Sequence, residues 1–272
     1  MGVQAVTKAR VISLLVLAAL AIPAAAALAA PDILPAAVGN KWEFETVKLL
    51  NATITIDGRD VAVMNNASSG TSVYEFVSVD DKKTPPVWSY TETTKMRSAV
   101  GGDEETDTSE IALTSDNAAL RIHSIVNTSA QGDDPDRQTY DPPLLYFDKN
   151  ASEGKPWDVG TMRDKDVNSS SKAAVVGKET VTVPAGTFKD CTKVIYSSES
   201  FTGTMEIMKK TFNMTGGRSR GIYWIADGVG IVKELEVSTS TAEAPGPAGK
   251  TIKMDAAVCS VSELKPGYVV KK

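Results

Sequence analysis

One cysteine-centred stretch is the first place to look for chemistry in this sequence. It reads V-P-A-G-T-F-K-D-C-T-K-V (Val183–Val194) and places Cys191 between Lys189 and Lys193 on one face of an alternating strand. Neighbouring lysines can lower the pKa of a thiol and so make it nucleophilic. A catalytic thiol also needs a base, and the single histidine, His123, lies in another alternating run. We therefore predict that the stretch turns a corner between two strands and that neither residue is catalytic.

Three further patterns could bind a ligand. Y-W-I-A-D-G-V-G-I-V-K (Tyr223–Lys233) has glycines after a strand, but the following residues alternate, so a hairpin is expected and not a nucleotide loop. The acidic clusters Asp103–Asp107 and Asp133–Asp136 could hold Ca²⁺, but they lack the spacing of calcium loops and are predicted to be solvated. No H-E-x-x-H, G-x-S-x-G, paired C-x-x-C or P-loop pattern occurs. We therefore predict no metal site, no cofactor and no enzymatic activity.

The elements that would position these residues are strands. Short alternating runs bounded by Gly, Asp, Asn and Pro recur after residue 29, and helical periodicity is almost absent. This predicts an all-β fold: a strongly curved, meander-rich antiparallel sheet or half-barrel with little helix. Predicted strands are 41–50, 53–56, 61–64, 73–79, 87–96, 111–113, 120–126, 173–183, 188–197, 204–212, 222–226, 231–237 and 251–261.

Turns, loops and core aromatics complete this prediction. The Asp57-Gly58 and Asp227-Gly228 steps indicate hairpin turns, because glycine accepts the positive φ that such turns require. The polar stretches 101–108, 131–137 and 242–250 are predicted as loops, and 144–172 shows no clear element. We also expect three tryptophans beside alternating apolar residues to be buried: Trp42, Trp157 and Trp224.

The N-terminal residues 1–29 have the pattern of a secretory signal peptide. Lys8 and Arg10 precede an apolar run, and Ala27-Leu28-Ala29 supplies the small residues of a cleavage site. Cleavage there would leave a single β-rich domain, residues 30–272, outside the cytoplasm in the periplasm or secreted. The alternative is an uncleaved membrane anchor, since the apolar run approaches spanning length.

Export bears on the two cysteines of the chain, Cys191 and Cys259. In an oxidising compartment the default is a disulfide, which we expect here. The competing interpretation is two buried thiols on different faces of a sheet, because a sequential meander would hold their strands several strand spacings apart.

The charge balance excludes some partners. The 272 residues include 29 Lys and Arg against 34 Asp and Glu, a net charge of −5, and the basic residues are scattered. Such a chain is poorly suited to bind nucleic acid or anionic membrane surfaces. No later apolar run is long enough to span a bilayer, so no stable membrane insertion is expected after signal cleavage.

Three segments of the chain belong together: V-G-N-K-W-E-F (Val38–Phe44), V-P-A-G-T-F-K-D-C-T-K-V (Val183–Val194) and Y-W-I-A-D-G-V-G-I-V-K (Tyr223–Lys233). They resemble segments of a group of uncharacterised exported bacterial proteins with TapB-like domains of unknown function. The resemblance implies a curved sheet similar to the half-barrel of the lipoprotein carriers LolA and LolB, whose concave face holds acyl chains. It matches no ligand-contacting residue position by position.

These observations predict a non-catalytic extracytoplasmic protein that binds an apolar ligand or a partner segment on a concave sheet. A structural or adhesive module of the cell envelope is the alternative, with an envelope protein as its partner. A hydrolase with an unrecognised site is the third interpretation, disfavoured by the missing motifs.

Overall fold

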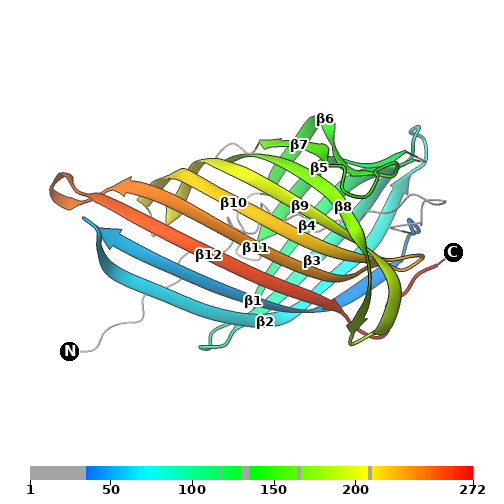
Figure 1. Ribbon diagram of the computed structural model, residues 1–272, viewed down its shortest axis with the longest axis horizontal. Coiled ribbons are helices and arrows are strands. Elements are labelled where there is room, and N and C mark those ends of the chain that lie inside the picture. Colours follow the sequence, from blue (N-terminus) through cyan, green and yellow to red (C-terminus); the bar gives the residue numbers. More distant parts are fainter. Residues whose placement is uncertain (1–34, 117, 130–134, 164–166, 208–209, 272) are drawn as a thin grey trace.

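The computed structural model describes residues 35–116, 118–129, 135–163, 167–207 and 210–271, and they form one 12-stranded antiparallel sheet (Figure 1). The strands are β1 (Lys41–Ile56), β2 (Arg59–Asp80), β3 (Val87–Ser98), β4 (Glu105–Ser115), β5 (Ala119–Ser129), β6 (Asp136–Asp148), β7 (Trp157–Arg163), β8 (Val167–Val183), β9 (Gly186–Ile207), β10 (Lys210–Ala226), β11 (Gly230–Pro245) and β12 (Thr251–Leu264). A single 3₁₀ turn, η1 (Pro247–Gly249), is the only helical element in these ranges. The prediction of an all-β curved antiparallel sheet is confirmed.

The strand order explains why the sheet must curve. It runs β6-β5-β4-β3-β2-β1-β12-β11-β10-β9-β8-β7, so the first and last strands pair in the middle and the two edges are β6 and β7. These edges are consecutive in the chain, and a short loop between Asp148 and Trp157 joins them. The sheet therefore bends round until its edges meet, as the neighbouring β6 and β7 show in Figure 1.

Side chains join the two edges where they meet. The Trp157 indole N–H donates to the Leu145 carbonyl oxygen at 3.3 Å. The Trp157 ring also packs edge-on against Phe147, with centroids 5.1 Å apart. From β9, two strands in from the β7 edge, the Tyr196 hydroxyl donates to the Tyr146 carbonyl oxygen on β6 at 2.9 Å. Aromatic contacts therefore link the sheet edges.

The predicted turns are confirmed. Asp57 and Gly58 both have positive φ, 51° and 74°, as a primed hairpin turn requires. Gly228 has a φ of 67° in the turn between β10 and β11. The corner after Val183 is a tight hairpin, because Val183 pairs directly with Gly186 and leaves Pro184 and Ala185 as the turn.

Several predicted boundaries are wrong. β6 and β7 arise largely in stretches to which no strand was assigned, and the predicted strand 204–212 spans the reversal between β9 and β10. Parts of the expected loops 101–108, 131–137 and 242–250 are strand, since β4 begins at Glu105, β6 at Asp136 and β11 ends at Pro245. Pairing with a neighbouring strand satisfies the backbone of these polar segments, and it outweighs their weak intrinsic strand propensity.

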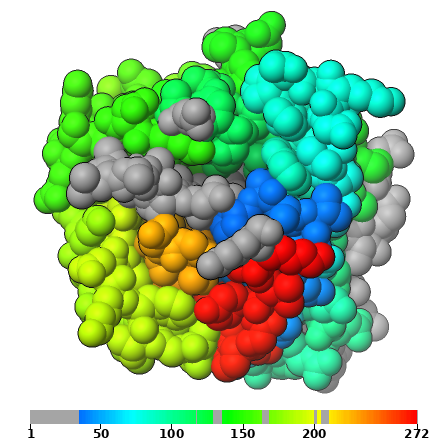
Figure 2. All heavy atoms as spheres, turned by 90° about the vertical axis from the view of Figure 1, so that its right-hand side faces the viewer, coloured from blue at the N-terminus to red at the C-terminus, as the bar shows by residue number. Residues whose placement is uncertain are grey.

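The main core fills one end of the curved sheet. Trp42, Trp157 and Trp224 are 2%, 8% and 8% exposed, which confirms that all three are buried. The Trp42 indole reaches across this end and donates to the Val229 carbonyl oxygen at 2.6 Å. Figure 2 views this end, where the β8–β9 hairpin, the β10–β11 turn, the start of β1 and the C-terminal residues gather. A backbone hydrogen bond from Ala185 to Leu264 ties the hairpin to β12.

The described residues contain no helix that is long and apolar enough to cross a membrane. The predicted signal peptide, residues 1–29, lies outside the described residues, and the single-domain assignment of 30–272 remains a prediction.

Candidate functional site

The two cysteines are free thiols, which contradicts the disulfide we expected. Cys191 is fully buried on β9, and Cys259 is half-buried on β12. Strands β10 and β11 lie between them in the sheet. Three strand spacings of about 4.8 Å far exceed the Cα separation of about 7 Å that a disulfide tolerates. Strand order therefore decides against the bond, whatever the redox compartment.

Thiol titration should detect both cysteines. Unfolded, unreduced protein is expected to show two reactive thiols per chain, measured with a chromogenic disulfide reagent. In the native protein Cys259 should react first, because Cys191 is 0% exposed and burial raises the pKa of its thiol. Unfolded protein without reactive thiols would instead mean that the two are bonded.

The other sequence-derived candidates do not assemble into a site. The His123 imidazole shares a 3.0 Å hydrogen bond with the Thr114 hydroxyl, and burial lowers its pKa. Within the ranges that the structure describes, no cluster of three His, Cys, Asp or Glu side chains could hold a metal ion. Asp133 and Asp134 lie outside those ranges. Burial raises the pKa of the Cys191 thiol, which argues against a nucleophilic role.

A cluster of glutamates and tyrosines lies on the concave face instead. The Tyr74 hydroxyl on β2 donates to the Glu234 carboxylate on β11, with oxygen distances of 3.1 and 3.3 Å. It also interacts with Glu92 on β3. Strands β3 and β11 are separated in the sheet by β2, β1 and β12, so these two carboxyls converge only because the sheet curves.

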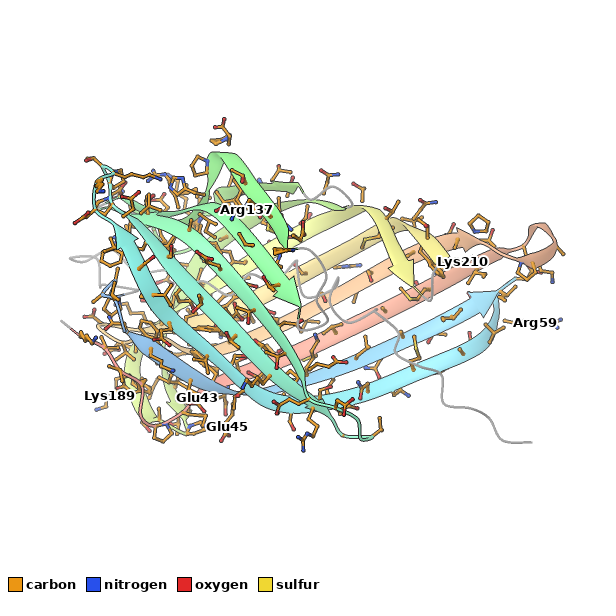
Figure 3. All side chains as sticks on the ribbon, turned by 180° about the vertical axis from the view of Figure 1, so that it is seen from behind. Glu43, Glu45, Arg59, Arg137, Lys189 and Lys210 are labelled. Carbon is orange, nitrogen blue, oxygen red and sulfur yellow. The ribbon has the colours of Figure 1, made fainter. Side chains whose placement is uncertain are left out.

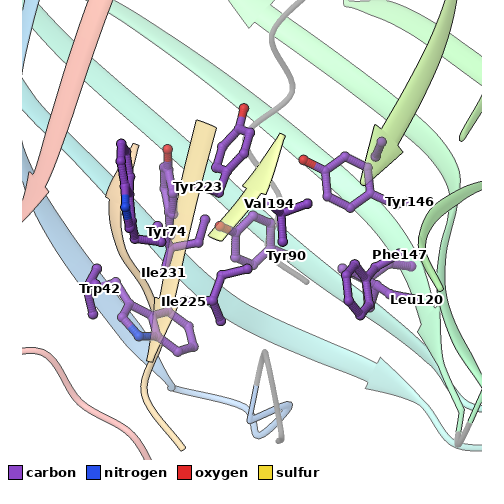
Figure 4. Close-up of a cluster of buried hydrophobic side chains, with 14 of the residues drawn as sticks. Trp42, Tyr74, Tyr90, Leu120, Tyr146, Phe147, Val194, Tyr223, Ile225 and Ile231 are labelled. Atoms are coloured by element: carbon purple, nitrogen blue, oxygen red, sulfur yellow. The ribbon is translucent and has the colours of Figure 1, made fainter. Parts of the chain in front are cut away.

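A third glutamate extends the cluster along β11. The Tyr223 hydroxyl on β10 donates to Glu236 Oε1 at 2.6 Å. Tyr223 reaches it by lying over Gly221 on its own strand, where an added Cβ would be 2.7 Å from the ring. The absence of a side chain at Gly221 therefore leaves room for the Tyr223 ring. Figure 4 shows the hydroxyl ends of Tyr74 and Tyr223 pointing the same way, away from Trp42 and Ile225.

Burial raises the pKa of all three carboxyls. It raises the pKa of Glu92 to about 8, with the Glu236 charge adding to the effect and the Tyr74 hydrogen bond opposing it. It raises the pKa of Glu236 to about 7, against the Tyr223 hydrogen bond and the Lys48 charge. Glu234 is 4% exposed, and burial together with the two neighbouring carboxylates holds its pKa well above the ordinary value. Near neutral pH the cluster therefore retains protons.

Beside the cluster runs a ladder of hydroxyl groups across four adjacent strands. Thr46 on β1 lies 3.1 Å from both Ser72 on β2 and Ser262 on β12, measured between hydroxyl oxygens. Ser72 in turn lies 3.0 Å from Thr94 on β3. Each hydroxyl can donate and accept, so the ladder satisfies itself inside the fold. The middle of the concave face is consequently polar.

Apolar side chains lie on both sides of this polar belt. The main core is on one side, and on the other a smaller cluster gathers Leu50, Ala52, Ala256 and Val258 from β1 and β12. Lys48 lies between the ladder and this smaller cluster along β1, and it is half-buried. The concave face is thus apolar, then acidic and hydroxyl-rich, then apolar again.

The alternating pattern is inverted around this cluster, so it could not be predicted from the rule that apolar residues face the core. In I-V-K-E-L-E-V (Ile231–Val237), Leu235 and Val237 look like the core face of a strand and the glutamates like its solvent face. In the structure Glu234 is buried and Val237 is 42% exposed. The signal available was the shared parity of Glu234 and Glu236 with Val232, which is fully buried.

Residues 149–238 match the model of the DUF3108-like family. This match to a domain of unknown function confirms the resemblance to uncharacterised proteins, and the half-barrel carrier class remains a prediction. The DUF3108-like segment runs from β7 into β11 and contains two of the three segments that carried the resemblance, with Val38–Phe44 outside it.

The DUF3108-like segment supplies three of the five residues of the cluster. Glu234, Glu236 and Tyr223 lie within it, whereas Glu92 and Tyr74 come from strands outside it.

A crystal structure of a putative lipoprotein from Parabacteroides distasonis is 17% identical, with a TM-score of 0.32, over 86% of this chain and 99% of that one. No curated protein matches the sequence.

Proposed function

We propose that this is a non-catalytic extracytoplasmic protein that binds an apolar or amphipathic ligand on the concave face of its curved sheet. The observation that carries the proposal is the polar belt between two apolar zones. Burying three carboxyls and a row of hydroxyls inside a fold is costly, and such groups persist where they serve a ligand or a structural network. The concave face offers both an apolar surface and a few convergent polar groups, as ligand sites do.

The carboxyl cluster supports binding rather than catalysis. Paired acid–base chemistry, in which one group is the acid while its neighbour is the base, uses titratable groups whose environments push their pKa values apart. Here burial pushes the pKa values of Glu92, Glu234 and Glu236 in the same direction. The matched family model describes a domain of unknown function.

An apolar reporter dye tests the proposal. N-phenyl-1-naphthylamine should bind saturably, with increased fluorescence. Ala256→Trp should weaken binding about tenfold or more by filling the concave side, because Ala256 pairs with Ala52 beside Leu50. Ala257→Trp is the matched control, since the adjacent residue faces the opposite side of the same strand.

Lipid carried through purification gives a second readout that needs no variant. Mass spectrometry of organic extracts of the exported wild-type protein should show a copurified apolar compound. Absence of both saturable dye binding and a copurified compound would refute the proposed function.

A structural or adhesive role in the envelope is the second candidate, and the convex face favours it. Val47 and Leu49 on β1 and Val237 on β11 are 49%, 46% and 42% exposed, although each lies in the middle of a strand. Exposed apolar side chains in one region often mark contact with another protein. Crosslinking from position 49 that captured an envelope protein, with no ligand on the concave face, would favour this role.

A further inference from the structure

Two carboxyls of the concave cluster have no positive partner. Among the residues that the structure describes, no lysine or arginine stabilises the charge of Glu92 or Glu234. Lys48, which shares the inward parity of Thr46 on β1, interacts with Glu236, Asp107 and Glu105 instead. The side of the cluster formed by Glu92 and Glu234 is therefore an acidic site that lacks its own counter-charge.

A third polar group on this side is also unpaired. Tyr90 on β3 is 0% exposed, and its hydroxyl has no hydrogen-bond partner. Its ring lies 5.8 Å from that of Tyr74, and the charges of Glu92 and Glu234 both act on its hydroxyl. A fully buried hydroxyl left without a partner is rare in folded proteins and calls for an explanation. A group that hydrogen-bonds to Tyr90 when it enters the cluster would supply one.

We propose that Glu92, Glu234 and the Tyr90 hydroxyl bind the protonated amine of an amphipathic ligand, whose apolar chain lies along the concave face. This assignment rests on the proposed function. A primary ammonium has three N–H donors and no acceptor. An entering ammonium favours the ionised forms of Glu92 and Glu234, which release their protons to solvent. The two carboxylates and the Tyr90 oxygen then provide three acceptors from β3 and β11. A ligand carboxylate or phosphate would be repelled by either carboxyl in its ionised form, and an alcohol brings no positive charge that could pair with them.

The half-burial of Glu92 supports access to this site. Glu92 faces the concave side with Tyr74 as its cross-strand neighbour, yet it remains half-buried, whereas Glu234 is buried. The adjoining Lys48 and Glu236 are also half-buried. The cluster is thus reached from the concave side at Glu92 and closed behind Glu234.

Three probes that share one chain length separate the charge requirement from apolar binding. Decylamine, decan-1-ol and decanoate should be titrated against the full exported protein by calorimetry at neutral pH. Decylamine is expected to bind at least about tenfold more tightly than decan-1-ol, with decanoate the weakest. Equal affinities for all three would overturn the amine assignment and leave the proposed function standing. No binding of any probe would count against both.

Conservative variants locate the charge requirement. Glu234→Gln keeps the size of the side chain, and it should weaken decylamine binding about tenfold while changing decan-1-ol binding less than about threefold. Glu92→Gln should act in the same direction and serves as the second variant if the first fails to fold. Glu45→Gln is the control, because Glu45 is exposed and points outward from β1 (Figure 3). A preference for decylamine that survived both interior variants would refute the site.

Discussion

The protein should become more stable, not less, as the pH falls from about 9 to about 6.5, because the concave carboxyls prefer their protonated forms in the folded chain. The pKa of Glu92 rises from an ordinary 4.5 to about 8, and that of Glu236 to about 7. The folded chain therefore holds more protons than the unfolded chain between about pH 4.5 and 8. Stability is fully present below the unfolded pKa and is lost as the pH rises through the folded one.

The size of this effect follows from the shift. Each unit of raised pKa corresponds to about 1.4 kcal/mol, so Glu92 alone should lower the free energy of unfolding at pH 9 by a few kcal/mol. Glu234, whose pKa is also raised, adds in the same direction. Two other groups limit the pH range in which stability increases on acidification. The lowered pKa of His123 opposes this increase at about pH 6 and below, and the lowered pKa of Lys48 opposes it at high pH.

Thermal unfolding followed by circular dichroism checks this expectation. Glu92→Gln should raise the melting temperature at pH 9 and flatten its dependence on pH, because an amide has no proton to lose. Glu45→Gln, exposed on the outer face of β1, should leave the slope unchanged. A melting temperature that stayed constant or increased between pH 6.5 and 9 in the wild type would contradict the burial of ionisable carboxyls on the concave face.

The sequence predicts the fold class and most strands because alternating apolar residues and turn glycines mark them clearly. Alternation locates β8, β11 and β12 and the first half of β9, whereas β10 was predicted in two pieces, one of which crosses its start. The Asp57-Gly58 and Asp227-Gly228 turns are where glycine allows positive φ. β7 was missed because it is short and glycine interrupts it at Gly160, which has a φ of 128°. β7 becomes an edge strand because it pairs with β8 and because Trp157 contacts β6. Neither contact can be predicted from the sequence of β7 alone.

The candidate site was beyond sequence reasoning for a different reason. The rule that apolar residues face inward holds at the ends of the concave face and fails in its middle. Along β1, Thr46 faces the interior and is 6% exposed, whereas Val47 and Leu49 face outward. Along β11 the same inversion buries Glu234 and exposes Val237. Which face is concave depends on the curvature of the sheet, and that follows from the strand order, not from any single strand.

Replacing Trp224 with alanine should destabilise the protein by roughly 3–5 kcal/mol, the range typical of large buried aromatics. The Trp224 side chain is 8% exposed, and its indole N–H donates to the Glu179 carboxylate on β8. The ammonium groups of Lys193 on β9 and Lys233 on β11 lie 5.1 and 5.9 Å from the ring centroid. One indole on β10 therefore connects the strands from β8 to β11, and its loss removes packing and two cation–π contacts together.

Two further variants separate these contributions in denaturant unfolding. Trp224→Phe keeps most of the ring packing and loses the indole N–H, so it should cost only about 1 kcal/mol. Trp88→Ala removes a half-buried indole that packs edge-on against Phe76 at 5.9 Å, and it should cost less than Trp224→Ala. The slope of unfolding against denaturant should stay unchanged if only stability is altered. An indole that contacts side chains from three neighbouring strands cannot be removed without a loss of stability. If Trp224→Ala protein unfolded at the same denaturant concentration as the wild type, the β10–β11 hairpin would contribute little to the stability of the core.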